Sequence, residues 1–273
     1  MRNRIDAMIG AIAGDIIGQP YEFRGVDEQH FKFFDRQCQY TDDTVLTMAV
    51  ADWLCHPGSS LQDYLLLYGR KYDWIGYGGM FLRSCRSSTP RPYNSFGNGS
   101  AMRVSAVACW ANSIEEAMAL ARKSAMPTHN HPEGIKGAQA IAVATLMARL
   151  GQPKEQIKSK LLELFDYDLN RPYLDLYNAD YVFDVTCQGT VPAALICFFE
   201  SISYEDCLFK AVLTNKDTDT AAAVAGAVAG AFYGVPVKIR QQALSRLPKE
   251  FIDVIQRFEA CLPAPEHPAG EQP

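Results

Sequence analysis

The sequence has few features that would place the chain on a nucleic acid, in a membrane or around zinc. Its 26 lysines and arginines are outnumbered by 31 acidic residues, giving a formal net charge of −5 and no basic surface for nucleic acid or anionic lipid. No apolar run reaches the roughly 18 residues that a membrane-spanning helix needs. The eight cysteines form no CxxC pair and lie mostly in apolar segments. We therefore expect buried free thiols and a reducing, cytoplasmic compartment.

The N-terminal segment is basic and then apolar, as in a secretory signal peptide. However, Asp6 and Asp15 interrupt it and no small-residue cleavage site follows promptly, so a helix of the mature protein is expected. Hydrophobic residues make up 48% of the chain and charged residues 21%, as in ordinary globular proteins. We predict one domain over residues 1–262, a disordered tail over 263–273, and a monomer.

Helical periodicity dominates the apolar pattern, which predicts an all-α fold. The expected helices are 3–19, 43–55, 60–72, 99–111, 113–125, 132–150, 153–165, 190–201, 203–213, 219–233 and 247–260. Tyr181–Val185 is the only short β-like run. Residues 83–100 have little periodicity and are expected to form a long loop of the kind that is usually functional or mobile.

Glycines recur at four-residue spacing in two of these helices. They are Gly10, Gly14 and Gly18 near the N-terminus, and Gly226, Gly230 and Gly234 in a late segment. Because a helical glycine costs about 1 kcal/mol relative to alanine, such a stripe indicates closely packed helix backbones. Packing alone explains the stripes, and we infer no internal repeat.

Two acidic motifs begin predicted helices, namely Thr41–Thr44 (TDDT) and Asp217–Thr220 (DTDT). Either motif alone is explained by helix N-capping. Together they offer four carboxylates and several hydroxyls, and carboxylates that meet in a fold repel one another unless a cation intervenes. An all-oxygen set suits Mg²⁺, Mn²⁺ or Ca²⁺ rather than zinc. Spacing alone does not decide whether the two motifs meet.

Three further segments are candidates for binding or catalysis. Ser95–Arg103 (SFGNGSAMR) is either an anion nest suited to phosphate or a turn with a helix cap. Thr128–Gly134 (THNHPEG) contains a His-x-His pair that either ligates a metal or caps the next helix. A zinc amidohydrolase is disfavoured, because the only histidine downstream is His267, in the predicted tail. Glu22 lies between two aromatic residues and is either an acid/base group or an ordinary surface side chain.

Together, the five segments resemble the ADP-ribosylglycohydrolase family, which includes the dinitrogenase-reductase-activating glycohydrolase and the J1 crystallins. The resemblance runs from AGDIIGQPYEF through YTDDT, SFGNGSAMR and THNHPEGIKGAQA to DTDTAAAVAGAVAGAFYG, over roughly residues 5–235. It implies an all-α, compact, single-domain orthogonal helical bundle. It also implies two divalent cations, Mg²⁺ or Mn²⁺, in a cleft that takes ADP-ribose or an ADP-ribosylated protein.

The resemblance further implies roles for individual residues. The metal ligands would be Thr41, Asp42, Asp43, Asp217, Asp219 and Thr220. The diphosphate and distal ribose of ADP-ribose would be held by Ser95, Phe96, Gly97, Asn98 and Gly99, with His129 lining the same groove. Glu22 would position or activate the attacking water, and Asp42, Asp43 and Asp219 are candidates to protonate the acceptor.

The implied reaction is hydrolysis of the bond between ADP-ribose and its acceptor, with mono-ADP-ribosyl-arginine on protein as the first choice. Serine-linked ADP-ribose, O-acetyl-ADP-ribose and related small molecules are alternatives, with acceptor contacts expected from residues 70–95. So are a non-catalytic, crystallin-like ADP-ribose-binding protein and a divalent-metal phosphohydrolase acting on nucleotides. One departure stands out, because many relatives carry Gly-Gly or Gly-Asp where this chain has Asn215-Lys216. Lys216 repels a cation if its amine points inward, and otherwise pairs with Asp217 or a substrate phosphate.

Overall fold

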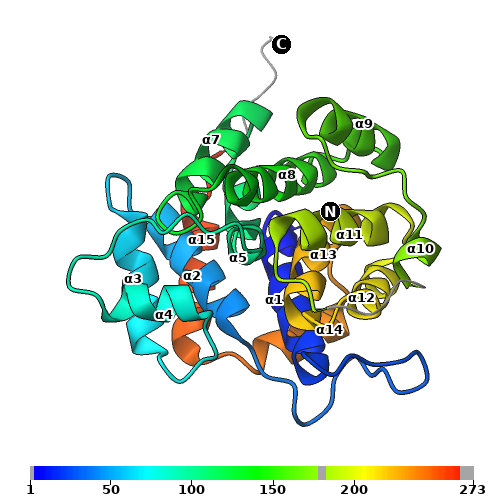
Figure 1. Ribbon diagram of the computed structural model, residues 1–273, viewed down its shortest axis with the longest axis horizontal. Helices are drawn as coiled ribbons and strands as arrows, with labels where there is room; N and C mark the ends of the chain where they lie inside the picture. Colours follow the sequence, from blue (N-terminus) through cyan, green and yellow to red (C-terminus); the bar gives the residue numbers. More distant parts are fainter. Residues whose placement is uncertain (1–2, 178–182, 265–273) are drawn as a thin grey trace.

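Two helices from distant parts of the sequence form the centre of the fold. The computed structural model describes residues 3–177 and 183–264, and within these ranges α1 (Asp6–Gly18) and α13 (Thr218–Tyr233) lie side by side (Figure 1). Every residue of α1 is buried, as are the residues of α13 up to Ala231. Apolar and small residues on all sides of α1 explain this complete burial, because the helix has no polar face to turn to solvent.

The two glycine stripes face each other. A side chain on Gly10 would overlap the carbonyl oxygen of Gly226, and one on Gly14 would overlap that of Ala222. The predicted close approach of two backbones is therefore confirmed. Gly234 differs from the other glycines in the stripes, because it lies just after α13 with φ of 80° and ends the helix. At the other end of the pair, the Thr218 hydroxyl donates to the Gly18 carbonyl over 2.7 Å, which fixes the end of α1 against the start of α13.

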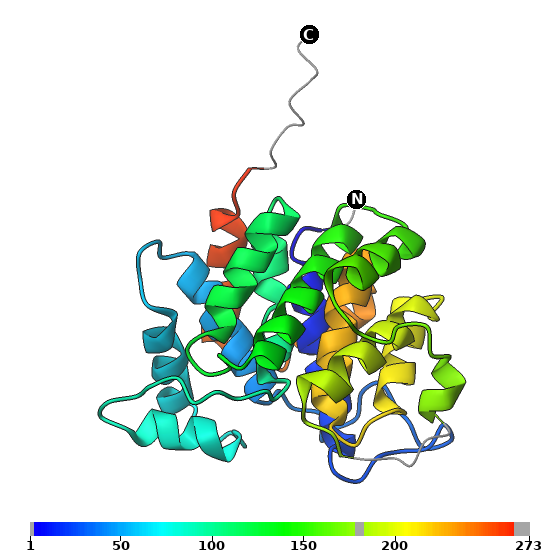
Figure 2. The same ribbon diagram turned by 45° about the horizontal axis from the view of Figure 1, so that its top comes forward.

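The remaining helices surround this pair, with the two flanks of Figure 1 built from different parts of the chain. On one flank are α2 (Asp42–Leu54), α3 (Leu61–Lys71) and α4 (Gly79–Arg86). On the other are α10 (Tyr173–Tyr177), α11 (Cys187–Phe199) and α12 (Tyr204–Val212). Between them in sequence are α5 (Gly99–Met102), α6 (Ser105–Trp110), α7 (Ile114–Ala125), α8 (Pro132–Arg149) and α9 (Lys154–Leu164). The turn η1 (Gln19–Tyr21) extends α1, and α14 (Val237–Leu244) and α15 (Lys249–Cys261) follow α13. Figure 2 shows the same arrangement turned by 45° about the horizontal axis, and α8 packs against α13 of the central pair.

The prediction of an all-α fold is confirmed over the described residues, where the only extended pairing is an isolated antiparallel bridge between Gly97 and Thr186. None of the helices in this part of the chain combines the length and hydropathy needed to cross a bilayer. The β-like run 181–185 is not a strand at Phe183–Val185, and its first two residues lie outside the described ranges. Residues 265–273 also lie outside them, so the disordered tail stays a prediction.

Two of the sequence-based boundaries are wrong. The segment expected to be irregular from residue 83 is helical up to Arg86, because α4 has only Phe81 and Cys85 as buried residues and so lacks a long apolar stripe. The helix expected over 99–111 is divided into α5 and α6, with Arg103 and Val104 in the turn between them. The short helices α10 and α14 were not expected, because they bury few residues or none.

Candidate active site

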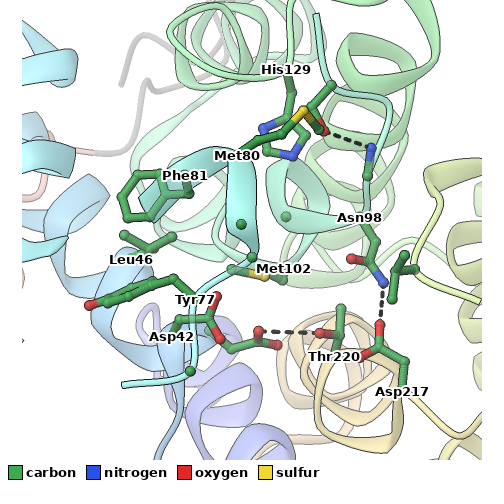
Figure 3. Close-up of a pocket in the computed structure, with 18 of the residues that line it drawn as sticks. Asp42, Leu46, Tyr77, Met80, Phe81, Asn98, Met102, His129, Asp217 and Thr220 are labelled. Atoms are coloured by element: carbon green, nitrogen blue, oxygen red, sulfur yellow. Dashed lines mark hydrogen bonds between the residues drawn. The ribbon is translucent and has the colours of Figure 1, made fainter. Parts of the chain in front are cut away.

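All five sequence motifs meet at one pocket of about 690 Å³ (Figure 3). Its lining includes every residue predicted for the site except Thr41, namely Glu22, Asp42, Asp43, Ser95, Phe96, Gly97, Asn98, Gly99, His129, Asp217, Asp219 and Thr220. Spacing alone left open whether the two acidic motifs meet, and the fold brings them together. The roles of these residues stay predictions, whereas their placement around one cavity is a feature of the structure.

The acidic side chains form a tight cluster at the bottom of the pocket. Glu22, Asp217 and Asp219 each place a carboxylate oxygen within 4.8 Å of the others. The Thr220 hydroxyl donates to Asp43 Oδ1 over 3.2 Å, which joins the start of α13 to the start of α2. The second oxygen of Asp43, Oδ2, is buried and has no hydrogen-bond partner in the described part of the chain. A buried oxygen without a donor points to a missing positive partner.

Asp15 of α1 holds the start of α2 in place. Its fully buried carboxylate accepts from the Thr41 N–H at 3.0 Å and the Thr41 hydroxyl at 2.7 Å. It also accepts from the Thr44 N–H at 3.1 Å and from the Thr44 hydroxyl. The helix is capped by Thr41, whose hydroxyl oxygen accepts from the Asp43 N–H at 3.3 Å. Asp42 and Asp43 are therefore not used as caps. Because the Thr41 hydroxyl already serves Asp15 and the cap, its role as a metal ligand stays a prediction.

The start of α13 is held by amide side chains. No side chain caps this helix, and the Asp217 carboxylate instead accepts from Asn98 Nδ2 over 2.6 Å. Asn215 Oδ1 accepts from the backbone N–H groups of Asp217 and Asp184, at 3.0 and 3.1 Å, and its Nδ2 donates to the Asp184 carbonyl at 2.8 Å. The departure at Asn215 thus has a structural purpose, since its side chain fixes the turn before α13.

Lys216 is the other residue that differs from the pattern of many relatives, and it helps to position Glu22. Its backbone carbonyl accepts from the Phe23 N–H over 2.8 Å, and Phe23 adopts a left-handed conformation with φ of 65°. This bond holds the segment after α1 against the turn before α13, so that Glu22 lies beside Asp217.

Burial raises the pKa values of the acidic cluster. It raises the pKa of Glu22 to about 7, with further contributions from the charges of Asp217 and Asp15. It raises the pKa of Asp42 to about 8 and that of Asp217 to about 6. The pKa values of Asp43 and Asp219 also lie well above the usual range, again through burial first and then through neighbouring carboxylates. Without a cation, Asp42 with its pKa of about 8 retains a proton at neutral pH, and a bound dication would favour the charged forms of the whole cluster.

The glycine-rich loop forms the opposite wall. Three of its N–H groups are used within the protein, because Ser95 donates to the Thr128 carbonyl, Gly97 to Ser95 Oγ and Asn98 to the Val185 carbonyl. The expected nest of successive free N–H groups is therefore not found at these three positions. The loop instead presents the Phe96 ring, which is 47% exposed, and backbone without side chains at Gly97 and Gly99.

The two histidines of the His-x-His segment have different surroundings. His131 caps α8 by accepting from the Glu133 N–H over 3.1 Å, as the capping alternative predicted. His129 is buried at the pocket, and its Nε2 lies 3.1 Å from where a Cβ on Gly99 would be. Gly99 thus allows the imidazole to approach the loop closely.

Sequence reasoning missed several residues of the pocket. Leu46, Tyr77, Met80, Phe81 and Met102 form an apolar wall near Asp42 (Figure 3). Asp15 was also missed, because it looked like an interruption in an apolar helix. Several of the wall residues fall within 70–95, the range expected to contact the acceptor, although contact itself stays a prediction. The residue pattern of this segment gave no signal, because its glycines and aromatics follow no period.

The all-α fold and its acidic pocket define the protein as a helical protein with a carboxylate-rich candidate site. A family model described as ADP-ribosylglycohydrolase matches residues 2–264, almost the whole chain. The chain belongs to the ADP-ribosylglycohydrolase family, as the sequence motifs predicted.

Individual relatives agree with the family. The chain is 26% identical to the ADP-ribosylhydrolase ARH3 of Bos taurus, over 84% of this chain and 84% of that protein. It is 23% identical to the ADP-ribosylarginine hydrolase Tri1 of Pseudomonas putida (strain GB-1), over 91% and 73%. It is 27% identical to the ADP-ribosyl-[dinitrogen reductase] glycohydrolase of Rhodospirillum rubrum, over 85% of each. A solved structure, an ADP-ribosylglycohydrolase-related protein complex, shares the fold with a TM-score of 0.71 at 24% identity, covering 96% of this chain and 99% of that one.

Proposed function

We propose that the protein is a divalent-metal-dependent ADP-ribosyl glycohydrolase that removes mono-ADP-ribose from arginine side chains of proteins. The observation that carries the proposal is one pocket in which the acidic cluster faces the glycine-rich loop. Its volume of about 690 Å³ is in the range of sites for ligands the size of a nucleotide sugar. The name of the Pseudomonas putida relative, an ADP-ribosylarginine hydrolase, supports the choice of arginine.

The residues present fit a pair of hard divalent cations, Mg²⁺ or Mn²⁺. The donors are carboxylate and hydroxyl oxygens, and the buried, unpartnered Asp43 Oδ2 is a position that a cation would satisfy. The side chains that would hold the cations are Thr41, Asp42, Asp43, Asp217, Asp219 and Thr220, with Glu22 adjoining them. When bound, the cations would polarise a water molecule and orient the ribose hydroxyls.

The protein's own residues would supply proton transfer. As the bond between the anomeric carbon and the acceptor breaks, the sugar develops oxocarbenium character. The water oxygen forms the new bond to that carbon, and Glu22 takes the proton that the water loses. A second carboxyl, from Asp42, Asp43 or Asp219, gives a proton to the leaving acceptor atom. The raised pKa of Glu22, about 7, suits a group that accepts and returns a proton near neutral pH.

The apolar wall suits the acceptor end. The rings of Tyr77 and Phe81, with centroids 5.1 Å apart, lie in the pocket wall with Asp42, and aromatic faces beside carboxylates attract a guanidinium group.

One observation favours the alternative of a neutral acceptor, such as serine or an acetyl group. Outside the acidic cluster, the charged residues lining the pocket are Arg83 and Arg103, both cationic.

The test is release of free ADP-ribose from three substrates: arginine-linked protein, serine-linked protein and O-acetyl-ADP-ribose. Each is incubated with Mg²⁺, with Mn²⁺ and with chelator, and products are separated chromatographically. We expect chelator-sensitive release, greatest from the arginine-linked substrate. Release of AMP or phosphate instead would make the protein a phosphohydrolase. ADP-ribose binding without release from any substrate would make it a non-catalytic binding protein.

The proposed setting is the cytoplasm. All eight cysteines are free thiols, and six of them, all but Cys55 and Cys261, are fully buried. Buried unpaired thiols are typical of proteins that fold under reducing conditions.

A further inference from the structure

A buried arginine forms part of the pocket wall and has no acidic partner in the described part of the chain. Arg103 is 1% exposed and sits in the turn between α5 and α6. Its Nη2 donates to the Ser124 carbonyl and to Thr128 Oγ1, both at 2.8 Å. Its Nε has no hydrogen-bond partner, and no ion pair of Arg103 occurs among the described residues. A guanidinium in this position places an uncompensated positive charge next to the pocket.

This arginine determines the direction of the neighbouring hydrogen bonds. A guanidinium only donates, so Thr128 Oγ1 must accept from Arg103. The same Oγ1 lies 2.7 Å from His129 Nδ1. If the threonine proton is given to His129, Nδ1 accepts and the ring carries its own proton on Nε2.

Electrostatics favour the same tautomer. In a neutral imidazole the lone-pair nitrogen is the negative end of the ring dipole and the N–H is the positive end. Because Arg103 lies on the Nδ1 side, its charge favours the lone pair there and the N–H on the far side. Burial, assisted by Arg103, lowers the pKa of His129 well below its usual value, so the ring is neutral. Tyr93 also forms a side-chain hydrogen bond with Thr128.

The far nitrogen, Nε2, faces the ligand side of the pocket. In Figure 3 the His129 ring lies at the pocket edge above Asn98. Nε2 is 3.1 Å from a Cβ on Gly99 and 3.6 Å from one on Gly97, so it lies directly against the glycine-rich loop.

We infer that Arg103 and Thr128 are positioning residues that hold His129 as the tautomer with its proton on Nε2. That N–H then donates to an anionic oxygen of a nucleoside diphosphate sugar. The inference rests on the proposed function for the identity of the ligand but not for the tautomer. It assigns to Arg103, which acts through Thr128, the role of fixing the hydrogen-bond donor of His129.

The tautomer is measured directly on the full-length protein. In ¹⁵N-histidine-labelled protein, the two ring nitrogens of His129, assigned by comparison with His129→Gln, give separate resonances for bare and protonated nitrogen. We expect Nδ1 bare and Nε2 protonated in the wild type, and a mixed or inverted state in Thr128→Val. Thr128→Ser, which restores the hydroxyl, should restore the wild-type pattern. A wild type with the proton on Nδ1, or a Thr128→Val spectrum unchanged from wild type, would overturn the inference.

Binding of ADP-ribose, measured by calorimetry with Mg²⁺ and with chelator, gives the functional effect. Thr128→Val should weaken binding about tenfold, because the donor is no longer fixed toward an anionic acceptor. The matched control is Thr145→Val, which also removes a buried threonine hydroxyl. Unlike that of Thr128, the Thr145 hydroxyl has no hydrogen-bond partner in the described part of the chain, and it does not line the pocket. Gly99→Ala should also weaken binding, by crowding Nε2, while leaving the His129 tautomer unchanged.

The proposed reaction and the positioning role of Arg103 and Thr128 can be contradicted independently of each other. The tautomer pattern together with ADP-ribose binding but no release from any substrate would contradict the proposed reaction and support the positioning role. Release of ADP-ribose by a protein whose His129 carries its proton on Nδ1 would support the reaction and contradict the positioning role. Equal loss of affinity in Thr128→Val and Thr145→Val would show a general stability effect and overturn the role of Thr128.

Discussion

The starts of α2 and α13 bring the same chemical groups to the pocket but are held by different means. At α2, one buried carboxylate, Asp15, gathers four donors from Thr41 and Thr44. At α13, the Asn98 amide donates to Asp217, and the Asn215 amide both donates and accepts. At α2 the cap is Thr41, so Asp42 and Asp43 are not needed as caps, whereas at α13 Asp219 itself accepts from the Thr220 N–H at 2.9 Å. An aspartate in the first turn is thus evidence for a site once the cap is seen to be another residue.

Removing an aspartate from either helix start should have the largest effect. We expect Asp219→Ala and Asp42→Ala each to lower the rate of ADP-ribose release by about a thousandfold or more, because each removes a carboxylate from the proposed metal and proton-transfer set. The rate is measured with saturating Mg²⁺ on the best substrate. Asp63→Ala, which removes an exposed first-turn acid of α3, is the control. Near-normal release in either pocket variant would contradict the mechanism.

Removing the support of α2 should have the next largest effect. Asp15→Ala leaves two hydroxyls and two N–H groups in a buried site without their acceptor. We expect the free energy of unfolding to fall by about 3 kcal/mol, measured by urea denaturation. Metal-dependent release should also be lost, because α2 is no longer fixed to α1. A loss below about 0.5 kcal/mol would mean that Asp15 does not determine the position of α2.

Removing the support of the start of α13 should lower the free energy of unfolding less than removing the support of α2. Asn215→Ala removes two hydrogen bonds to Asp184 and one to the Asp217 N–H within the turn before α13. We expect a loss of about 2 kcal/mol in the free energy of unfolding. Asn170→Ala, in an exposed loop, is the control. If Asn215→Ala lowered the free energy of unfolding more than Asp15→Ala, the order of the two helix starts would be reversed.

The pH dependence of stability should show the smallest effect. The pKa values of Asp15, Asp217 and Glu22 are raised to about 6, 6 and 7 in the folded, metal-free protein. Between pH 4 and pH 8 the folded state therefore binds more protons than the unfolded state, so the stability that these groups contribute is fully present below about pH 4 and is lost as pH rises through their folded-state pKa values. We expect Tm without metal to drop by about 3 °C or more from pH 5 to pH 8.

A bound divalent cation should oppose the fall in Tm with rising pH. Because a dication competes with protons for the same oxygens, the increase in Tm on adding Mn²⁺ should be larger at pH 8 than at pH 5. Differential scanning fluorimetry at both pH values measures it. An increase that is equal at both pH values, or absent, would show that the cluster does not exchange protons for a cation.

Much of the fold followed from the sequence, because helices with one continuous apolar stripe, such as α7 and α15, have an unambiguous period. The meeting of the two acidic motifs could be inferred only through the family resemblance. The supports behind the site could not be predicted, because the partner of a buried polar residue is far away in sequence. Asp15 and Thr41 are 26 residues apart, and Asn98 and Asp217 are 119 apart. The part of the apolar wall from Tyr77 to Phe81 could not be predicted for another reason, because its segment has no regular hydrophobic periodicity.

The glycine contacts between α1 and α13 also constrain when the site forms. Residues 6–18 and 218–233 have to pack backbone to backbone before Glu22 can lie beside Asp217 and Asp219. During synthesis, roughly two hundred residues must therefore leave the ribosome before the acidic cluster exists, and contacts at such long sequence separation form slowly. A nascent or truncated chain lacking α13 would have the start of α2 and the glycine-rich loop but not Asp219 or Thr220, so the acidic cluster would be completed only near the end of folding.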